Sequence, residues 1–285
     1  SLIQNGATKV ELAELSGLVI ANIQKETLSS GLKSQSYTGN PASGSVEYKR
    51  FKNSASQAYG TARTAGKGTA LTVPPTTVNL DTHREEAAKF DLDTFGVGNI
   101  MARRADNHVD TVAAELDAAF FTCAATEGTA FTTTETDIEA QVEALIQTLE
   151  TVKNDYVRGV PRNLIRLVLD PTYYGKIRTY LDKNTHNANV DTAAEDFALF
   201  HGVRVYSSIN LPVKADTPSA GKTTTYHMIA MIEGAIAQPA VIYPYGEPEK
   251  IPLSNDYGVS MFFDYGTKAL TPDLIFTYST EATDG

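Results

Sequence analysis

Residues 99–125 read NIMARRADNHVDTVAAELDAAFFTCAA, which has the pattern of a long amphipathic helix. Apolar side chains recur at spacings of three and four, as they do on one face of an α-helix. These side chains are Val109, Val112, Ala113, Leu116, Ala119 and Phe120. The opposite face is marked by Arg103, Arg104, Asp106, Asp110, Glu115 and Asp117. Some 25 residues with a rise of about 1.5 Å each predict a helix roughly 37 Å long.

The segment before this helix has an extended pattern instead. Residues 58–80, AYGTARTAGKGTALTVPPTTVNL, contain almost no large apolar side chain before Leu71, so the segment cannot build a core of its own. Its flanks alternate as strands do. We expect a two-stranded hairpin with its tip around residues 65–68 and strands of about 12–15 residues, reaching roughly 40–50 Å. Because an isolated two-stranded hairpin is marginal in water, it needs another surface to lie on.

The hairpin segment is basic although the chain as a whole is acidic, with a net charge of −10. Between Gly44 and Leu80 the only acid is Glu47. The cations in this range are Lys49, Arg50, Lys52, Arg63 and Lys67. They either keep a solvated loop soluble or bind an acidic surface on an identical copy of the chain. The acidic total argues against a general nucleic-acid binder, because contacts to phosphates need cations.

The remaining chain alternates predicted helices and strands. Residues 7–28 and 137–153 have helical spacing, and Thr136 with Glu139 has the pattern of a capping box. Residues 164–169 form an apolar strand, after which Asp170 is a candidate N-cap and Pro171 a first helical residue. Residues 202–212, 223–234 and 257–280 have strand patterns, whereas residues 235–242 fit a short helix or a strand.

No constellation in the sequence has the spacing of a catalytic, cofactor or metal site. The five histidines include no zinc-binding pair, and residues 219–225, SAGKTTT, resemble a P-loop end but have Asp216 where the pattern needs glycine. Cys123, the only cysteine, is expected in the core. The apolar runs are too short for a membrane span. We therefore expect no enzyme, no cofactor and no metal; the alternative from a different class is a hydrolase that uses Asp170 or His201.

The order of these elements resembles the major capsid protein of tailed bacteriophages, which has the HK97-like fold. In that family an N-terminal arm precedes an extended β-hairpin called the E-loop, a long spine helix, an axial (A) domain, and strands that complete a peripheral (P) domain. The resemblance rests on five segments: ALTVPPTTVNLDTHREEAAKFDL, IMARRADNHVDTVAAELDAAFF, LIRLVLDPTYYGKIRTYL, GVRVYSSINLP and DYGVSMFFDYGTKALTPDLIFTY.

The resemblance implies an α+β fold divided in the same way. The N-terminal arm would span residues 1–39 and the E-loop residues 40–88. The P domain, with the spine helix, would comprise residues 89–136 and 246–285, and the A domain residues 137–245.

The resemblance also implies a function. The chain would be a structural head protein that self-assembles into pentamers and hexamers of an icosahedral shell enclosing double-stranded phage DNA, without catalysis. The five hairpin cations would contact the neighbouring subunit. Expected partners are further copies, a scaffolding protein and a portal protein, with a decoration protein left open. The protein would be assembled in the bacterial cytoplasm and reside in the virion, without specific nucleic-acid binding or membrane contact. A bacterial encapsulin shell of the same fold is the second structural alternative.

Overall fold

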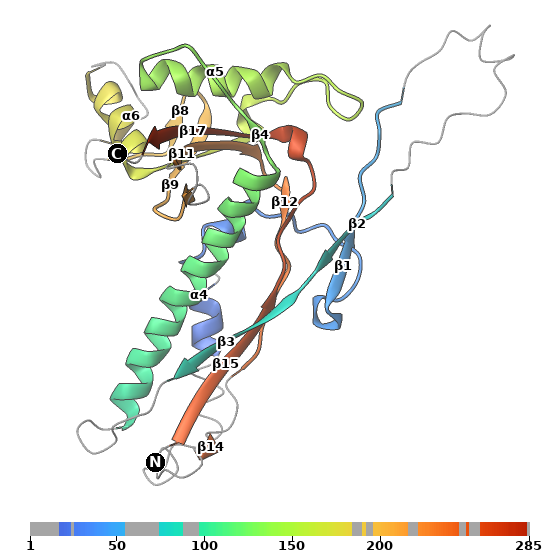
Figure 1. Ribbon diagram of the computed structural model, residues 1–285, viewed down its shortest axis with the longest axis vertical. Helices are drawn as coiled ribbons and strands as arrows, with labels where there is room; N and C mark the ends of the chain where they lie inside the picture. The colour runs from blue at the N-terminus through green and yellow to red at the C-terminus, as the bar shows by residue number, and fades with distance from the viewer. Residues whose placement is uncertain are drawn as a thin grey trace, which may run out of the picture.

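The computed structural model describes residues 17–23, 26–54, 74–87, 97–183, 190–191, 196–215, 222–244, 249–250 and 257–283. An α/β body lies at one end of the molecule, and a long helix with accompanying strands runs away from it (Figure 1). The segment around residues 45–54 lies at the side of the molecule.

The body is built on a mixed seven-stranded sheet, in which the order is β4-β17-β11-β5-β9-β8 and β10 also pairs with β11. Its strands are β4 (Thr129–Ala130), β5 (Ile165–Leu169), β8 (Leu199–Phe200), β9 (Val203–Ser207), β10 (Val213–Ala215), β11 (Lys222–Ile232) and β17 (Ile275–Thr283). The β5–β9 and β17–β4 pairs are parallel and the other pairs are antiparallel.

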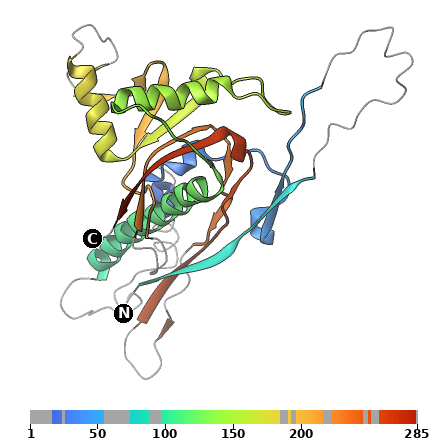
Figure 2. The same cartoon turned by 45° about the horizontal axis from the view of Figure 1, so that its top comes forward.

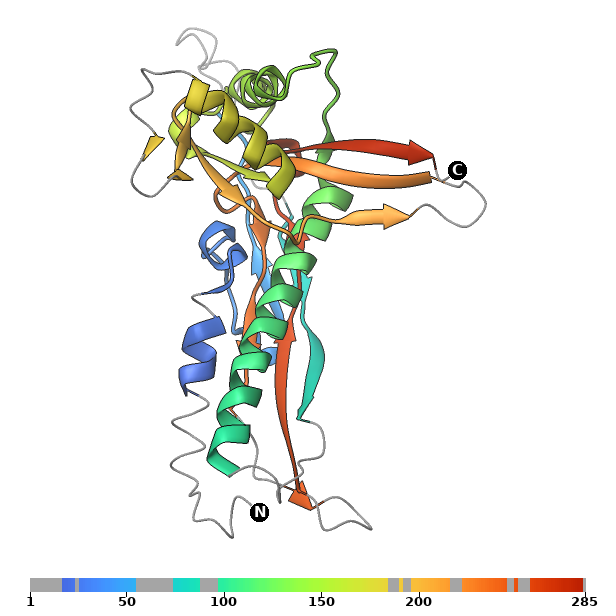
Figure 3. The ribbon, with the colours of Figure 1, turned by 90° about the vertical axis from the view of Figure 1, so that its left-hand side faces the viewer.

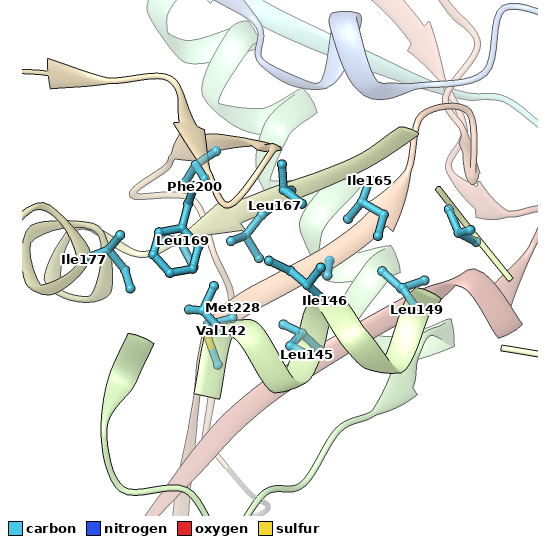
Figure 4. Packing of buried hydrophobic residues seen from close by; sticks show 14 of the residues in the cluster. Val142, Leu145, Ile146, Leu149, Ile165, Leu167, Leu169, Ile177, Phe200 and Met228 are labelled. Carbon is cyan, nitrogen blue, oxygen red and sulfur yellow. The ribbon is translucent and has the colours of Figure 1, made fainter. Parts of the chain in front are cut away.

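Helices cover both faces of this sheet because its central strands are apolar on both sides. On β5, Leu167 and Leu169 point to one face and Val168 to the other. The first face packs against α5 (Ile138–Thr151) and α6 (Pro171–Lys183), as Figure 4 shows for the side chains of this cluster. The second face packs against Phe120 and Phe121 at the end of α4 (Val97–Glu127) and against α2 (Ser29–Leu32).

The long helix α4 has 31 residues and runs beside a second sheet (Figure 3). This sheet contains β3 (Asp81–Ala87), β13 (Ala240–Ile242), β14 (Glu249–Lys250) and β15 (Tyr257–Tyr265). Met261 and Phe263, two residues apart on β15, are buried against Val109 and Val112 of α4. Val19 and Ile23, from the helical residues 17–23, join the same cluster, so this part of the predicted N-terminal arm packs on α4.

Three two-stranded sheets and three short 3-10 helices complete the description. The sheets pair β1 (Ser45–Tyr48) with β2 (Thr76–Asn79), β6 (Val190–Asp191) with β7 (Asp196–Phe197), and β12 (Ile236–Ala237) with β16 (Lys268–Ala269). The 3-10 helices are η1 (Pro41–Ser43), η2 (Arg162–Leu164) and η3 (Pro272–Leu274).

Several predictions of local structure are confirmed. The long helix exists, strand β5 begins one residue later than predicted, and α6 begins at Pro171. The Asp170 carboxylate accepts the Tyr173 backbone N–H at 2.7 Å, as an N-cap does. The segment left open at residues 235–242 consists of the two short strands β12 and β13. Cys123 is buried in the core as expected.

Other local predictions were wrong. The cap of α5 is Asp137, which makes no side-chain cap hydrogen bond, and not the Thr136–Glu139 box. Asp117 lies in the interior and not on the exposed face of α4. The described pairing of the hairpin covers four residues on each strand, and Phe51 is a further β-bridge residue. Residues 55–73 lie outside the described residues, so the predicted strand length stays a prediction.

Strand pairing joins segments that the sequence analysis assigned to different domains, and the division itself stays a prediction. Of residues 246–285, strand β15 lies in the sheet beside α4, but β17 pairs with β11 in the large sheet. Similarly, β3 from the predicted E-loop range pairs along its length with β15. The apolar pattern of a strand indicates burial but does not indicate which sheet provides the partner.

Candidate functional site at the base of the hairpin

The five cations predicted to contact a second copy have different positions. Lys49 is exposed, whereas Arg50 and Lys52 contact acidic residues of the same chain. Arg63 and Lys67, together with the predicted hairpin tip, lie outside the described residues. Contact between these cations and a second copy therefore stays a prediction, and the structure adds an intrachain role for two of them.

The base of the hairpin is anchored in the body by its short ladder. Val46 and Val78 face each other across β1 and β2, and both are almost fully buried. With Tyr48 they pack against Ala237 and Leu270, near β12 and β16. Beyond β2 the chain continues directly into β3, which is held along β15. Both ends of the hairpin therefore start from packed structure, from which the chain projects to the side (Figure 2).

Arg50 makes the most specific contact at this base. Its Nη1 and Nη2 donate to Oδ1 and Oδ2 of Asp273, at 2.7 and 2.9 Å, which is the bidentate geometry that suits a guanidinium and a carboxylate. The guanidinium also lies over the ring of Tyr156, with Cζ 3.8 Å from the ring centroid. Burial alone would raise the pKa of Asp273, but Arg50 and Asn154 outweigh it and hold that pKa below its ordinary value.

Lys52, two residues after Arg50, also pairs with an acidic residue of the body. Its ammonium lies 3.0 Å from the Asp155 carboxylate, which raises the pKa of Lys52 chiefly through this hydrogen bond. The backbone N–H of Asn53 donates to the carbonyl of Asp155 at 2.8 Å. We call this set of contacts the hairpin clamp; its residues are Arg50, Lys52, Asn53, Asn154, Asp155, Tyr156 and Asp273.

The receiving side of the hairpin clamp is a turn that follows α5. The Asn154 side-chain oxygen accepts the backbone N–H groups of Tyr156 and Val157, at 2.9 and 2.8 Å, and so holds the turn in one shape. Asp273 belongs to η3, just before β17. The sequence analysis missed Asn154, Tyr156 and Asp273, because nothing in the local pattern links residues 119 and 223 positions apart.

The hairpin clamp leads to a first prediction. Replacing Arg50 by alanine removes the bidentate pair and the contact with Tyr156, so we expect a loss of about 1 kcal/mol in unfolding free energy, because the pair is partly exposed. Amide hydrogen exchange at residues 50–53 should become faster. Lys49→Ala, which removes the exposed neighbouring cation, is the matched control and should change neither quantity. Equal exchange in the two variants would contradict the clamp.

A second charged cluster joins α5 to the turn between β8 and β9. Arg162 donates through Nε and Nη2 to Glu150, at 2.7 and 3.0 Å, and through Nη2 to Glu143. His201 Nδ1 lies 2.7 Å from Glu143. His201 and Gly202 both have positive φ, at 48° and 86°, as a two-residue hairpin turn requires. Hydrogen bonds from Arg162, opposed by burial and aided by His201 and Gln147, lower the pKa of Glu143 to about 2.

This pKa predicts how stability depends on acid. A carboxylate with a folded-state pKa near 2 and an ordinary value of 4.5 stabilises the fold above pH 4.5, and this contribution is lost as the pH falls towards 2. The difference in unfolding free energy between the wild type and Glu143→Gln should therefore be largest above pH 4.5 and shrink below it. Urea unfolding at a series of pH values measures this difference. A difference that stays constant through the window would contradict the assignment.

The two residues considered for a hydrolase, Asp170 and His201, are not brought together. Asp170 Oδ2 lies 2.6 Å from His227 Nδ1, and His227 Nε2 lies 2.7 Å from Thr280 Oγ1. The pairing of β11 with β17 shifts register between Tyr226 and Met228, on either side of His227. The acid, imidazole and hydroxyl have the order of a catalytic triad. However, the other oxygen of Asp170 caps α6 and the ring of Tyr173 stacks on His227, so these contacts tie α6 to β11 and β17.

A cavity with a neutral lining lies beside α5. An open cavity of about 550 Å³ is lined by residues of α5 and of the segment before it, without any acidic, basic or histidine side chain. The lining residues are Phe131, Thr132, Thr133, Thr134, Ala144, Gln147, Thr148 and Thr151. Within the described ranges, no three His, Cys, Asp or Glu side chains are grouped as metal ligands would be. In the same ranges, no helix has the length and apolar character of a membrane span.

Comparison with known proteins identifies the fold. No protein-family model matches the sequence, and no curated protein matches it. Several solved structures, however, are similar to this chain. The capsid structure of the cyanophage P-SCSP1u is similar with a TM-score of 0.61 at 14% identity, covering 88% of this chain and 87% of that chain. The capsid of Ralstonia phage GP4 gives 0.58 at 14% identity, covering 89% and 86%.

A virus-like particle from Pyrococcus furiosus is also similar, with a TM-score of 0.55 at 11% identity, covering 93% of this chain and 97% of that chain. Each match spans most of both chains. The chain therefore has the HK97-like fold of phage capsid proteins, and the α+β fold class predicted from the sequence is confirmed.

Proposed function

We propose that this chain is the major capsid protein of a tailed bacteriophage, a structural subunit that associates with copies of itself into pentamers and hexamers of an icosahedral shell around double-stranded DNA. The observation that carries the proposal is the fold, which matches the capsid chains of two phages over most of their length. The function of those chains is structural, so the proposal includes no catalysis.

The described parts of the molecule support this role. The hairpin base is packed and clamped, and the described residues 49–54 project from it at the side of the molecule (Figures 1 and 2). Such a projection can bury its apolar and polar groups on a neighbouring subunit, which is how a heterologous contact generates a ring. The exposed Lys49 remains available for such a contact.

The division into capsid domains is part of the proposal. Residues 1–39 would be the N-terminal arm, 40–88 the E-loop, 137–245 the A domain, and 89–136 with 246–285 the P domain. Strand β17 is then the point where the two domains share a sheet, because its partner β11 belongs to the A domain. A scaffolding and a portal protein would act in assembly in the bacterial cytoplasm, and the finished protein would reside in the virion.

Size measurements on the assembled protein test the function. Multi-angle light scattering of the purified chain should give particles far heavier than the 30.7 kDa subunit, and their diameter distinguishes a phage head from a small encapsulin-like cage. A turnover of model esters that is lost in His227→Ala would favour the hydrolase alternative.

A further inference from the structure

Phe51 has an unusual position between the two cations of the hairpin clamp. Its side chain is 63% exposed, whereas Arg50 and Lys52 on either side contact Tyr156 and the acids beside it. Successive side chains of an extended chain point in opposite directions, so holding both neighbours against the body directs Phe51 away from it. The chain here runs past the turn after α5 (Figure 1). The protein thus fixes an aromatic side chain in an outward direction.

An exposed apolar side chain is common and by itself needs no explanation. Two observations distinguish Phe51. The first is preorganisation: the bidentate Arg50–Asp273 pair, the Lys52–Asp155 pair and the Asn53 N–H to Asp155 bond order the backbone on both sides of it. The second is location, because the residue begins the segment that leaves the body. Aromatic side chains that are ordered before association lose little conformational entropy when a partner buries them.

We propose that Phe51 is an aromatic anchor that inserts into an apolar recess on a second copy of this chain, and that the hairpin clamp is the device that presents it. The inference rests on the proposed self-assembly and names the residue that carries much of the contact. A second copy is the partner favoured by charge, because the exposed Lys49 lies two residues before Phe51 and the chain as a whole carries a net charge of −10.

Substitutions at Phe51 and at Arg50 test the anchor and the hairpin clamp through the yield of assembled shells. Phe51→Ser should leave the fold unchanged, since the side chain is exposed, and should reduce shell yield at least about tenfold, as truncation of a central interface residue does. Phe51→Leu keeps a large apolar group and should retain most of the yield. Arg50→Ala should also reduce the yield, and its combination with Phe51→Ser should be less than additive, because both act on one contact.

Photo-crosslinking identifies the partner directly. The benzoyl-phenylalanine derivative placed at position 51 keeps an aromatic group there and, on illumination, should join two copies into a covalent dimer of twice 30.7 kDa. The crosslinked peptide then locates the recess. Asp110, an exposed residue of α4 outside the hairpin, serves as the control position and should crosslink less efficiently.

The outcomes separate this inference from the proposed function. Three results together support the anchor. The wild type forms shells, the Phe51→Ser chain folds but forms none, and the photo-crosslinker at position 51 yields a covalent dimer. Wild-type shells together with equal yields from Phe51→Ser would overturn the anchor and leave the capsid function standing. Failure of the wild type to assemble, alone and with its neighbouring genes co-expressed, would overturn the capsid function and the anchor with it.

Discussion

A chain that lacks residues 54–68 is expected to fold normally and to form no shells. The deletion lies beyond the hairpin clamp, which ends at Asn53, and beyond the β1–β2 ladder, which pairs Ser45–Tyr48 with Thr76–Asn79. The packed base is therefore retained, and shortening a loop changes its closure entropy only slightly. What is lost is the part of the chain proposed to lie on a neighbouring subunit.

Circular dichroism and thermal melting of the deletion variant should match the wild type, while electron microscopy shows no particles. A variant in which residues 54–68 are kept in length but scrambled in order separates the need for a loop from the need for this sequence. Shells of normal size and number from the deletion variant would contradict the proposed role of the hairpin.

Asp117→Ala is expected to have the largest effect on stability. The carboxylate is only 6% exposed, and its two oxygens accept the backbone N–H groups of Leu28 and Ser29, at 3.1 and 2.8 Å. Burial raises the pKa of Asp117, and these hydrogen bonds oppose the rise. Alanine would leave two N–H groups without their acceptor, at a cost of about 2–4 kcal/mol in unfolding free energy.

The effect of Asp117→Ala should extend beyond the start of α2, because Asp117 belongs to a buried hydrogen-bond network. Ser29 donates through its hydroxyl to the Gln238 side chain at 3.0 Å, and Gln238 in turn donates to the Leu116 carbonyl at 2.8 Å. The network joins the N-terminal segment, α4 and the strands near β12. We therefore expect faster amide exchange across residues 28–32 as well as the loss in stability.

Urea unfolding measures this cost, and Asp110→Ala provides the control. Asp110 lies on the same helix but is exposed, so its removal should change the unfolding free energy by no more than about 0.5 kcal/mol. Equal effects of the two substitutions would show that the buried network does not stabilise the attachment of the N-terminal segment.

Sequence periodicity predicted part of the fold, and Asp117 shows where this kind of prediction ends. The apolar spacing of Val109, Val112 and Leu116 fixed the buried face of α4, and the Asp170–Pro171 pair located the start of α6. Helical spacing also assigned Asp117 to the polar face. Its burial depends on a partner segment 88 residues earlier in the chain, and no local pattern encodes that distance.

The candidate site could be predicted only in part, because its contacts also join residues that are far apart in the sequence. The excess of cations in residues 44–80 indicated the hairpin as a candidate contact region, but the sequence could not show that Arg50 pairs with Asp273, 223 residues away. Nor could alternation reveal that Arg50 and Lys52, on either side of Phe51, contact the turn that follows α5. In each case a tertiary contact, formed only in the folded chain, decides which role a charged or extended residue takes.

Negative-stain electron microscopy of the purified protein, combined with light scattering, tests the central claim most directly. We predict closed shells tens of nanometres across, formed by the chain alone or when it is co-expressed with its neighbouring genes. Monomers of 30.7 kDa under both conditions, at every protein concentration examined, would contradict the account.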